Sequence, residues 1–331
     1  MARKKFRIGF IGCGGNARGH GRRLAAIEEA QIVALADVSK KALAAFRQQV
    51  PGTAKVPAFT DYREMLNTVE LDAVEISTPH TLHYQQIMDS LDQGLHVLTE
   101  KPMVCTVEHA KQVIAKRDAT GKHLMISYQR HFSPPYIYAY ELLHSGDLGP
   151  VNFLCAHQCQ NWYRNQQGKW RLTQELGGGG QLNDSGSHLL DILLWMTDLR
   201  PVEVMALMDY KDTPVDIFSA ISVKFDNGAL GNISVVGHAI GRMHEDASIW
   251  CEEGTLFIRE GRVFQEVPGQ RMEPVPEEKM PAGSNPDRAF IDLLLGKAEN
   301  RVPAECGLRV IQLTEAAWES ARRGRAVQVE E

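Results

Sequence analysis

The sequence predicts an α/β protein with two parts, an N-terminal doubly wound parallel sheet and a C-terminal α+β domain with a large, mostly antiparallel open sheet. Up to residue 130, apolar strand-like segments alternate with helical segments, an order typical of a parallel sheet covered on both faces. From Val151 onward, β-branched or alternating segments follow one another with turns between them, as in antiparallel sheets. We therefore expect domains at 1–130 and 131–331, with Ser133-Pro134-Pro135 at the boundary.

The composition indicates a globular protein that binds neither nucleic acid nor membrane. With 331 residues, 44% of them hydrophobic, the chain is long enough for two cores. The net charge of −5 and the absence of a basic block exclude a nucleic-acid footprint. No apolar segment approaches the length of a membrane span, and Met1–Lys5 is not followed by a signal-peptide core. We expect a cytoplasmic protein with six reduced cysteines.

The first strand, turn and helix carry the strongest functional signal. Phe6–Ile11 is strand-like, helical composition begins at Arg18, and Gln31–Ala36 is a second strand. The turn between the first strand and the helix has the pattern G-x-G-x-x-A. Its glycines allow a tight turn and close approach of a pyrophosphate, and the helix N-terminus attracts phosphate. The unit predicts a dinucleotide site formed by Gly12, Gly14, Gly15, Asn16, Ala17 and Asp37.

Asp37 determines which dinucleotide we expect. It follows the second strand, where a carboxylate accepts hydrogen bonds from the ribose hydroxyls and repels a 2′-phosphate. This position favours NAD over NADP. The neighbouring Lys40 and Lys41 weaken that preference, so NADP stays an alternative.

The remaining elements of the first domain continue the alternation. The expected helices are Lys40–Gln49 capped by Ser39, a short helix capped by Asp61, Thr81–Gln93 and Val107–Thr120. The expected strands are Leu71–Ile76, His96–Thr99 and Leu124–Tyr128. In such sheets ligands bind beyond the carboxyl ends of the strands. Three further polar residues fall at these ends: Ser77, Thr78 and Lys101.

Lys101 is a candidate for contact with both substrate and cofactor. It follows a buried strand and precedes Pro102, which excludes a helical continuation. We expect its side chain to reach a substrate hydroxyl or the nicotinamide ribose, with a solvated surface lysine as the alternative.

His80 and His83 stand at the head of a helix. We assign them to helix capping and ribose contact rather than to a metal, because no cysteine or carboxylate is near them in sequence.

For the second domain, the sequence predicts a series of consecutive antiparallel strands followed by helices at the end of the chain. Asp226-Asn227-Gly228 predicts a hairpin turn, because Asn and Gly tolerate positive φ. Cys155, His157 and Cys159 alternate along one strand and share a face. A metal site is the alternative there, but no fourth ligand is evident and we predict no metal. The expected elements are strands 151–160, 202–210, 217–225, 229–236, 248–251, 255–259 and 263–267, and helices 136–145, 287–295 and 307–323.

A run of four glycines, Gly177–Gly180, precedes the most reactive-looking segment of this domain. We expect a ligand to approach its bare backbone, and a helix to start after it with Asp184 or Ser185 as cap. Asp184, His188 and Asp191 recur at helical spacing, and a histidine flanked by carboxylates is suited to general base catalysis. The alternative is a capped helix with a hydrogen-bonded core histidine.

Taken together, the motifs resemble those of the Gfo/Idh/MocA oxidoreductases over nearly the whole chain. The resemblance rests on four motifs in order: G-x-G-x-x-A with Asp37, Ser77-Thr78-Pro79-His80-x-x-His83, Glu100-Lys101-Pro102, and Asp184-x-Gly-x-His188-x-x-Asp191. It implies an NAD-binding Rossmann domain and a second domain that binds substrate and forms homodimers or homotetramers. It implies roles for five positions: Lys101 and His188 as the catalytic pair, Asp184 as the residue that contacts substrate and supports His188, Glu100 against the nicotinamide, and Arg130 near the cofactor.

The resemblance implies hydride transfer between nicotinamide and a secondary alcohol of a sugar or cyclitol. His188 is expected to remove the hydroxyl proton while Lys101 stabilises the developing alkoxide. A redox-neutral NAD-dependent glycosidase, which oxidises, eliminates, adds water and reduces again, begins with the same hydride step. A non-catalytic NAD-binding sensor is the third possibility, and it would need neither Lys101 nor His188.

One aromatic segment matches no substrate signature of the family. Trp162, Tyr163 and Arg164, with Trp170 beyond them, are expected to contact the substrate. Surface packing is the alternative for this segment.

Overall fold

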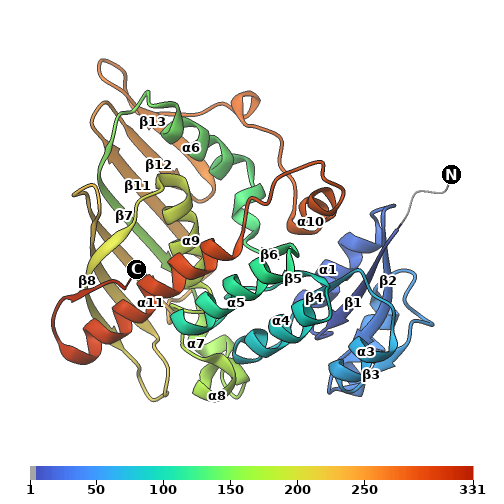
Figure 1. Cartoon of the computed structure of the whole chain (residues 1–331). Helices are drawn as coiled ribbons and strands as arrows, with labels where there is room; N and C mark the ends of the chain where they lie inside the picture. The colour runs from blue at the N-terminus through green and yellow to red at the C-terminus, as the bar shows by residue number, and fades with distance from the viewer. Residues whose placement is uncertain (1–4, 331) are drawn as a thin grey trace. The chain divides into compact units, whose positions relative to one another are not determined.

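The computed structural model describes residues 5–330, which form two compact units (Figure 1). The first unit comprises the chain up to Val104, Glu108–Tyr128 and Ser284–Gly307. The second comprises the rest of the described chain. The basic residues up to Lys4 lie outside the described range. Late in the chain, Ser284–Gly307 groups with the first unit. The expected domains 1–130 and 131–331 stay a prediction.

The first unit is built on a six-stranded parallel sheet, as the alternation of elements predicts. Its strand order is β3-β2-β1-β4-β5-β6, and every neighbouring pair is parallel. The order reverses beside β1, so the carboxyl ends of β1 and β4 border the point where such sheets bind ligands. The strands are β1 (Phe6–Ile11), β2 (Ala30–Ala36), β3 (Ala58–Phe59), β4 (Ala73–Ile76), β5 (His96–Thr99) and β6 (Leu124–Ile126).

Local sequence signals account for several helices of this unit. Ser39 caps α2 (Lys40–Gln49) by accepting from the Ala42 N–H, and Asp61 caps α3 (Tyr62–Thr68) by accepting from the Arg63 N–H. The expected helix from Thr81 is a short 3₁₀ turn, η1 (His80–Leu82), followed by α4 (His83–Asp92). The other helices are α1 (Gly15–Ala25), α5 (Val107–Thr120) and α10 (Pro286–Leu294).

Helix α1 begins at Gly15 rather than at Arg18, because the chain enters helical geometry directly after the glycine turn. Its buried residues join a core with Phe10 and Phe46, whose rings lie 4.9 Å apart. Ile291 of α10 belongs to the same core, so a segment near the C-terminus completes the packing around α1.

The second unit is built on a nine-stranded sheet in the order β14-β13-β12-β11-β7-β10-β9-β8-β15. Only the pair β7 and β10 is parallel among the described strand pairs of this sheet, so the expected antiparallel character is confirmed. The strands are β7 (Val151–Cys159), β8 (Pro201–Asp209), β9 (Phe218–Phe225), β10 (Leu230–Val236), β11 (His244–Cys251), β12 (Thr255–Arg259), β13 (Arg262–Glu266), β14 (Glu273–Pro274) and β15 (Val327–Gln328).

One face of this sheet is covered and the other is open. Burial alternates along β9, and Figure 1 shows α6, α9 and α11 together on one side of the sheet. Leu207 of β8 and Leu230 of β10 are 68% and 50% exposed. The predicted hairpin joins β9 and β10, with Gly228 at φ +90°. The helices of the unit are α6 (Pro134–Ser145), α7 (Trp162–Asn165), α8 (Gln174–Gly177), α9 (Gly186–Thr197) and α11 (Ala304–Arg323), with 3₁₀ turns η2 (Gln129–Phe132), η3 (Trp170–Leu172) and η4 (Glu277–Lys279).

Several details of the second unit differ from the sequence-based expectation. Strand β11 begins at His244 instead of Ser248, because its pairing with β7 continues to His244 opposite Cys159. Ser185 occupies the N-cap position of α9, but its side chain makes no capping hydrogen bond. In residues 5–330, no helix combines the length and the apolar character needed to cross a bilayer.

Candidate active site

The turn after β1 requires glycine for two reasons. Gly12 has φ +94°, which strains residues with a side chain. A Cβ on Gly12 would lie 2.5 Å from the carbonyl oxygen of Ser77, the first residue after β4. The Ser77 N–H donates to the Ile11 carbonyl at 2.8 Å. The backbones that leave β1 and β4 are therefore in direct contact at the ends of these two strands.

The start of α1 is open. Gly14 is the N-cap and no side chain caps the helix there. A Cβ on Gly14 or Gly15 would meet no atom within 4 Å, and Asn16 is exposed. Ala17, in contrast, is completely buried against the sheet. Open backbone N–H groups at a helix N-terminus form an anion site, so this turn has the form that accepts a pyrophosphate.

Asp37 is held at the rim of this site by backbone donors. Its Oδ2 accepts from the Cys13 N–H at 2.8 Å, and its Oδ1 accepts from the Ser39 N–H at 2.7 Å. A carboxylate has about four acceptor positions. Asp37 therefore retains acceptor capacity for ribose hydroxyls while its orientation is set by the turn that follows β1.

The turns after β4 and β5 are joined through His83. Its ring nitrogens lie 2.8 Å from the Pro102 carbonyl oxygen and 2.9 Å from the Thr78 carbonyl oxygen. Burial first, and then His80, lowers the pKa of His83 to about 4, so the ring is neutral near pH 7 and donates to one of the two carbonyls. His83 is completely buried. In the structure it links two turns, and its expected contact with a ribose stays a prediction.

Other predicted residues of these turns are also internally bonded. The Ser77 hydroxyl donates to Glu75, and the Thr78 hydroxyl donates to Gln86. His80 opens η1 and is 3% exposed. These contacts place the predicted residues at the strand ends, and their contacts with a cofactor remain predictions.

Lys101 follows β5 at the same edge of the sheet. The Glu100 N–H donates to the Ile76 carbonyl at 2.8 Å, which ties this turn to β4. The Lys101 N–H donates to Oε2 of Glu100 at 3.1 Å. The position of the Lys101 backbone therefore depends on the side chain of Glu100.

In the second unit, Asp184 is a buried carboxylate bound by two side chains. Its Oδ2 accepts from the Trp162 indole N–H at 2.7 Å and lies 2.9 Å from Nε of Arg171. Arg171 in turn lies 4.2 Å above the ring of Trp170. Sequence reasoning did not select Arg171, because nothing in the spacing indicates that it reaches a carboxylate thirteen positions away.

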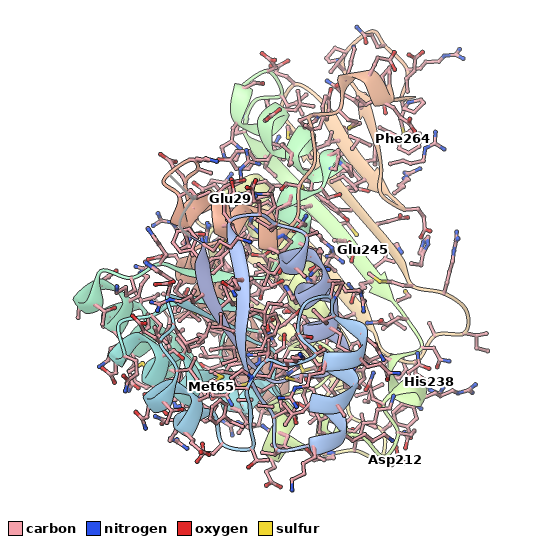
Figure 2. The ribbon with its side chains drawn as sticks, turned by 90° about the vertical axis from the view of Figure 1, so that its right-hand side faces the viewer. Glu29, Met65, Asp212, His238, Glu245 and Phe264 are labelled. Atoms are coloured by element: carbon pink, nitrogen blue, oxygen red, sulfur yellow. The ribbon has the colours of Figure 1, made fainter. Side chains whose placement is uncertain are left out.

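The aromatic segment packs within its own unit. Trp162 joins a small core with Val215 and Ile217. The Tyr163 hydroxyl donates to Asp212, and Arg164 Nε donates to His238 Nε2 at 2.9 Å (Figure 2 labels Asp212 and His238). These contacts correspond to the packing alternative, and contact of the segment with a substrate stays a prediction.

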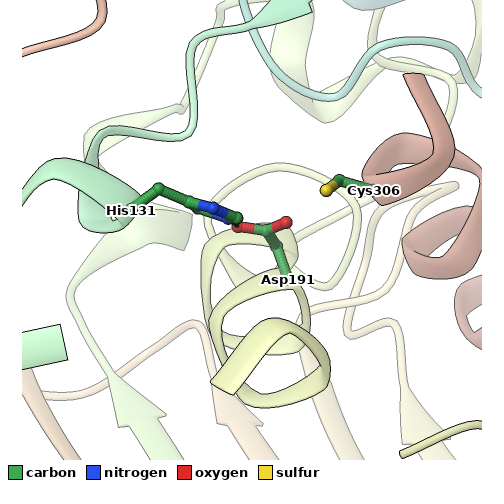
Figure 3. A group of neighbouring side chains, drawn as sticks. All are labelled: His131, Asp191 and Cys306. Atoms are coloured by element: carbon green, nitrogen blue, oxygen red, sulfur yellow. Dashed lines mark hydrogen bonds and ion pairs between the residues drawn. The ribbon is translucent and has the colours of Figure 1, made fainter. Parts of the chain in front are cut away.

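His188 and Asp191 of α9 have different surroundings. Asp191 Oδ2 lies 2.7 Å from Nε2 of His131, and both side chains are buried (Figure 3). His188 is only half-buried. One oxygen of Asp191 thus pairs with His131 of η2, and the expectation that Asp191 also flanks His188 stays a prediction. Asp184 precedes α9 and lies outside the helical face that the spacing suggested.

The glycine run is a tightly packed loop and not a linker. Asp216 accepts from the Gly180 N–H at 3.1 Å, the Leu182 N–H at 2.8 Å and the Trp318 indole N–H at 2.8 Å. A Cβ on Gly180 would lie 1.9 Å from the Asp216 carbonyl oxygen. The close approach that these glycines allow is to the protein's own backbone, which clamps the loop that leads to Asp184.

Arg130 is anchored inside the second unit. Its Nη2 donates to Glu245 at 2.6 Å, and Glu245 also accepts from Gln158 and from the Tyr136 hydroxyl (Figure 2 labels Glu245). Nη1 of Arg130 is buried and has no hydrogen-bond partner among residues 5–330. Its expected position near the cofactor stays a prediction.

Family models match both halves of the chain. Residues 6–128 match the model described as "Oxidoreductase family, NAD-binding Rossmann fold", and residues 136–257 match the GFO/IDH/MocA C-terminal domain. The chain belongs to the Gfo/Idh/MocA family. Its first unit is therefore the NAD-binding Rossmann domain of a Gfo/Idh/MocA oxidoreductase, in agreement with the open helix start and with Asp37.

Relatives of this Gfo/Idh/MocA protein are named as oxidoreductases. It is 30% identical over 211 residues to 1-carboxy-3-chloro-3,4-dihydroxycyclohexa-1,5-diene dehydrogenase of Comamonas testosteroni, a match that covers 63% of this chain and 52% of the relative. The chain thus spans about half the length of that relative. It is 25% identical to D-glucoside 3-dehydrogenase of Escherichia coli K12 over 99% of both chains.

Among solved structures, the aldose–aldose oxidoreductase of Caulobacter crescentus, complexed with glycerol, has a TM-score of 0.84 and 24% identity. That match covers 98% of this chain and 100% of the other. At this identity the likeness establishes the fold.

Sequence reasoning also missed a buried histidine of this Gfo/Idh/MocA protein. His20 of α1 is 3% exposed and lies against Glu100 and Asp287. Asp287 is 267 positions away in sequence, so no local pattern connects the two residues.

Proposed function

We propose that this protein oxidises a secondary alcohol of a sugar, sugar derivative or cyclitol with NAD as hydride acceptor. The observation that carries the proposal is the open glycine turn with Asp37 in an oxidoreductase-family chain that also has Lys101 at a strand end and His188 on α9. The match to D-glucoside 3-dehydrogenase over 99% of the chain supports a carbohydrate substrate.

The residues of the first unit fit an NAD site. The backbone from Gly12 to Ala17 would bind the pyrophosphate and Asp37 would bind the adenosine ribose. When bound, the nicotinamide supplies the hydride chemistry, and the protein supplies position and charge.

In this mechanism His188 accepts the proton of the substrate hydroxyl, since an imidazole is an effective base near neutral pH. The Lys101 ammonium stabilises the negative charge that develops on the oxygen. Asp184 supports His188 and contacts substrate. Trp162 and Arg171 both contact Oδ2 of Asp184, and these two contacts fix the orientation of the carboxylate.

A redox-neutral glycosidase is the second candidate. Oxidation at position 3 of a glucoside makes the neighbouring C–H acidic. The same oxidation is therefore also the first step of a route through elimination and rehydration. The relative named D-glucoside 3-dehydrogenase favours keeping this candidate. A non-catalytic NAD sensor is the third, and it does not explain Lys101 and His188.

Homo-oligomerisation and a cytoplasmic location complete the proposal. Leu207, Leu230 and the 38%-exposed Trp250 are apolar residues on the open side of the large sheet. Exposed apolar surface of this kind favours self-association into a dimer or tetramer.

The test is NADH formation by the purified protein with NAD and a panel of cyclitols, aldoses, ketoses and simple glycosides. Steady NADH formation with one compound supports the dehydrogenase and identifies the substrate class. Release of the aglycone from a glycoside without NADH accumulation supports the glycosidase instead. If the protein binds NAD but forms neither NADH nor free aglycone with any compound, the result contradicts both enzymatic candidates.

A further inference from the structure

The first unit contains a buried cluster of charged residues beneath the Lys101 turn. His20, in the middle of α1, lies between two carboxylates. Its Nδ1 is 2.8 Å from Oδ1 of Asp287 on α10, and its Nε2 is 3.2 Å from Oε1 of Glu100. Ser127 Oγ lies 3.4 Å from the same Nε2. His20 and Asp287 are 3% and 0% exposed, so water does not separate these charges.

This geometry requires a doubly protonated ring. A neutral imidazole has one N–H, so it would leave one ring nitrogen as an acceptor facing a carboxylate acceptor. In a buried site such a pair is costly. The imidazolium donates to both carboxylates. Burial alone would lower the pKa of His20, but the hydrogen bonds of its two ring nitrogens with Asp287 and Glu100 oppose this and raise that pKa well above its ordinary value.

The charges around His20 balance. Arg23 donates to the second oxygen of Asp287. Glu75 lies 3.9 Å from Nε2 of His20, and burial raises its pKa to about 8, so it is mostly protonated at neutral pH. Two cations, His20 and Arg23, then face two carboxylates. A buried group of charges is tolerated when it is paired in this way.

The cluster connects the cofactor helix to the Lys101 turn. Oε1 of Glu100 faces His20, and Oε2 of Glu100 accepts from the Lys101 N–H. We infer that His20 is a positioning residue, whose imidazolium fixes Glu100 and through it the backbone of Lys101. Because α1 also carries the phosphate-binding turn, one helix then sets the positions of both the cofactor phosphates and the catalytic lysine. The inference rests on the proposed function only for the role of Lys101.

The first test does not depend on activity. In the full chain labelled with ¹³C and ¹⁵N at histidine, the His20 signal is identified as the one missing from His20→Gln. We expect it to report both ring nitrogens protonated at about pH 8, where an ordinary histidine is neutral. A neutral His20 ring at that pH would overturn the inference, whatever the enzyme's substrate.

The second test separates positioning from folding. For His20→Gln we expect kcat to fall on the order of ten- to a hundred-fold, because a small displacement of a catalytic group lowers the rate by about this factor. We expect NAD affinity to change by less than about two-fold. His123→Gln is the matched control, since His123 is an exposed histidine at the opposite ends of the strands. Asp287→Asn, which removes one partner of the ring, is expected to lower kcat in the same way with the substrate KM nearly unchanged.

Each outcome decides the question. Unchanged kcat in both His20→Gln and Asp287→Asn overturns the inference, and so does a parallel loss of NAD affinity and thermal stability, which indicates general damage. If the wild-type protein oxidises no compound, the proposed function fails while the histidine spectrum still tests the state of His20.

Discussion

At the residue scale, Asp37 is the carboxylate to which we assign the cofactor choice. Two backbone N–H groups orient it, and its remaining acceptor positions would bind the adenosine ribose. For Asp37→Ala we expect NAD affinity to fall by about ten-fold, the loss of one or two hydrogen bonds to a charged group. NADP affinity is expected to rise relative to NAD. Fluorescence titration with both cofactors measures this, and an unchanged ratio would contradict the assignment of Asp37.

His188 is the residue on which the proposed chemistry depends most. Removing a general base typically lowers the rate by a factor of about 100 or more. We therefore expect His188→Ala to lose kcat while NAD affinity stays nearly intact, because the cofactor turn belongs to the first unit. Steady-state kinetics together with NAD titration measure both quantities. Full turnover in the variant would remove His188 from the mechanism.

In the proposed mechanism, Arg171 acts on catalysis through Asp184. Replacing it by methionine keeps much of the side-chain length but removes the cation 2.9 Å from a buried carboxylate. Because hydrogen bonds to charged groups contribute about 1.5–3 kcal/mol, we expect kcat/KM to fall by on the order of ten- to a hundred-fold. Arg262→Met, which changes an exposed arginine of β13, is the matched control. Equal kcat/KM in the two variants would show that Asp184 needs no such support.

At the element scale, the glycine loop is defined by its contacts with Asp216 and Trp318. A Cβ on Gly180 would collide with backbone, whereas one on Gly228 in the β9–β10 turn would meet no atom within 4 Å. We expect Gly180→Ala to lower the melting temperature and kcat together, because the loop that leads to Asp184 must move. Gly228→Ala, strained only by its φ of +90°, is expected to cost about 1 kcal/mol without loss of kcat. Thermal unfolding and kinetics on both variants compare the two effects, and wild-type kcat in Gly180→Ala would contradict the clamp.

At the scale of the whole molecule, buried titrating groups make stability depend on pH. The pKa of Glu75 is raised from 4.5 to about 8 by burial, and that of His20 is raised above 6.5. Both groups hold protons in the folded state that the unfolded chain releases, so stability is lost as pH rises. The pKa of His83 is lowered to about 4, so its contribution is lost in the other direction, as pH falls below 6.5.

Above pH 6.5 only the first two of these effects remain. We expect the unfolding free energy of the NAD-free protein to fall between pH 6.5 and 8, by at most about 1.4 kcal/mol per pH unit for Glu75, with His20 acting in the same direction. Urea unfolding at the two pH values measures the change, and Glu75→Gln is expected to reduce it. An equal fall in wild type and Glu75→Gln would mean that Glu75 is already ionised in the folded protein.

Local signals in the sequence account for most of the architecture. The βαβ turn, the caps at Ser39 and Asp61, and the Asp226–Gly228 hairpin each depend on residues a few positions apart. Backbone conformation and single hydrogen bonds decide such features, so a short stretch of sequence contains the whole interaction. The alternation of strands and helices likewise predicted the parallel sheet, and the succession of strands from Val151 predicted the antiparallel sheet.

The partners of the candidate site residues were decided only by the tertiary structure. Asp191 pairs with His131, Arg171 and Trp162 meet at Asp184, and the glycine run packs on Asp216. His20 reaches Asp287 across 267 positions of sequence. Helical spacing shows which side chains share a face, but it does not show what packs against that face. The sequence by itself therefore determined the elements, the family and the NAD site, while the packing of distant segments decided which charges are buried together.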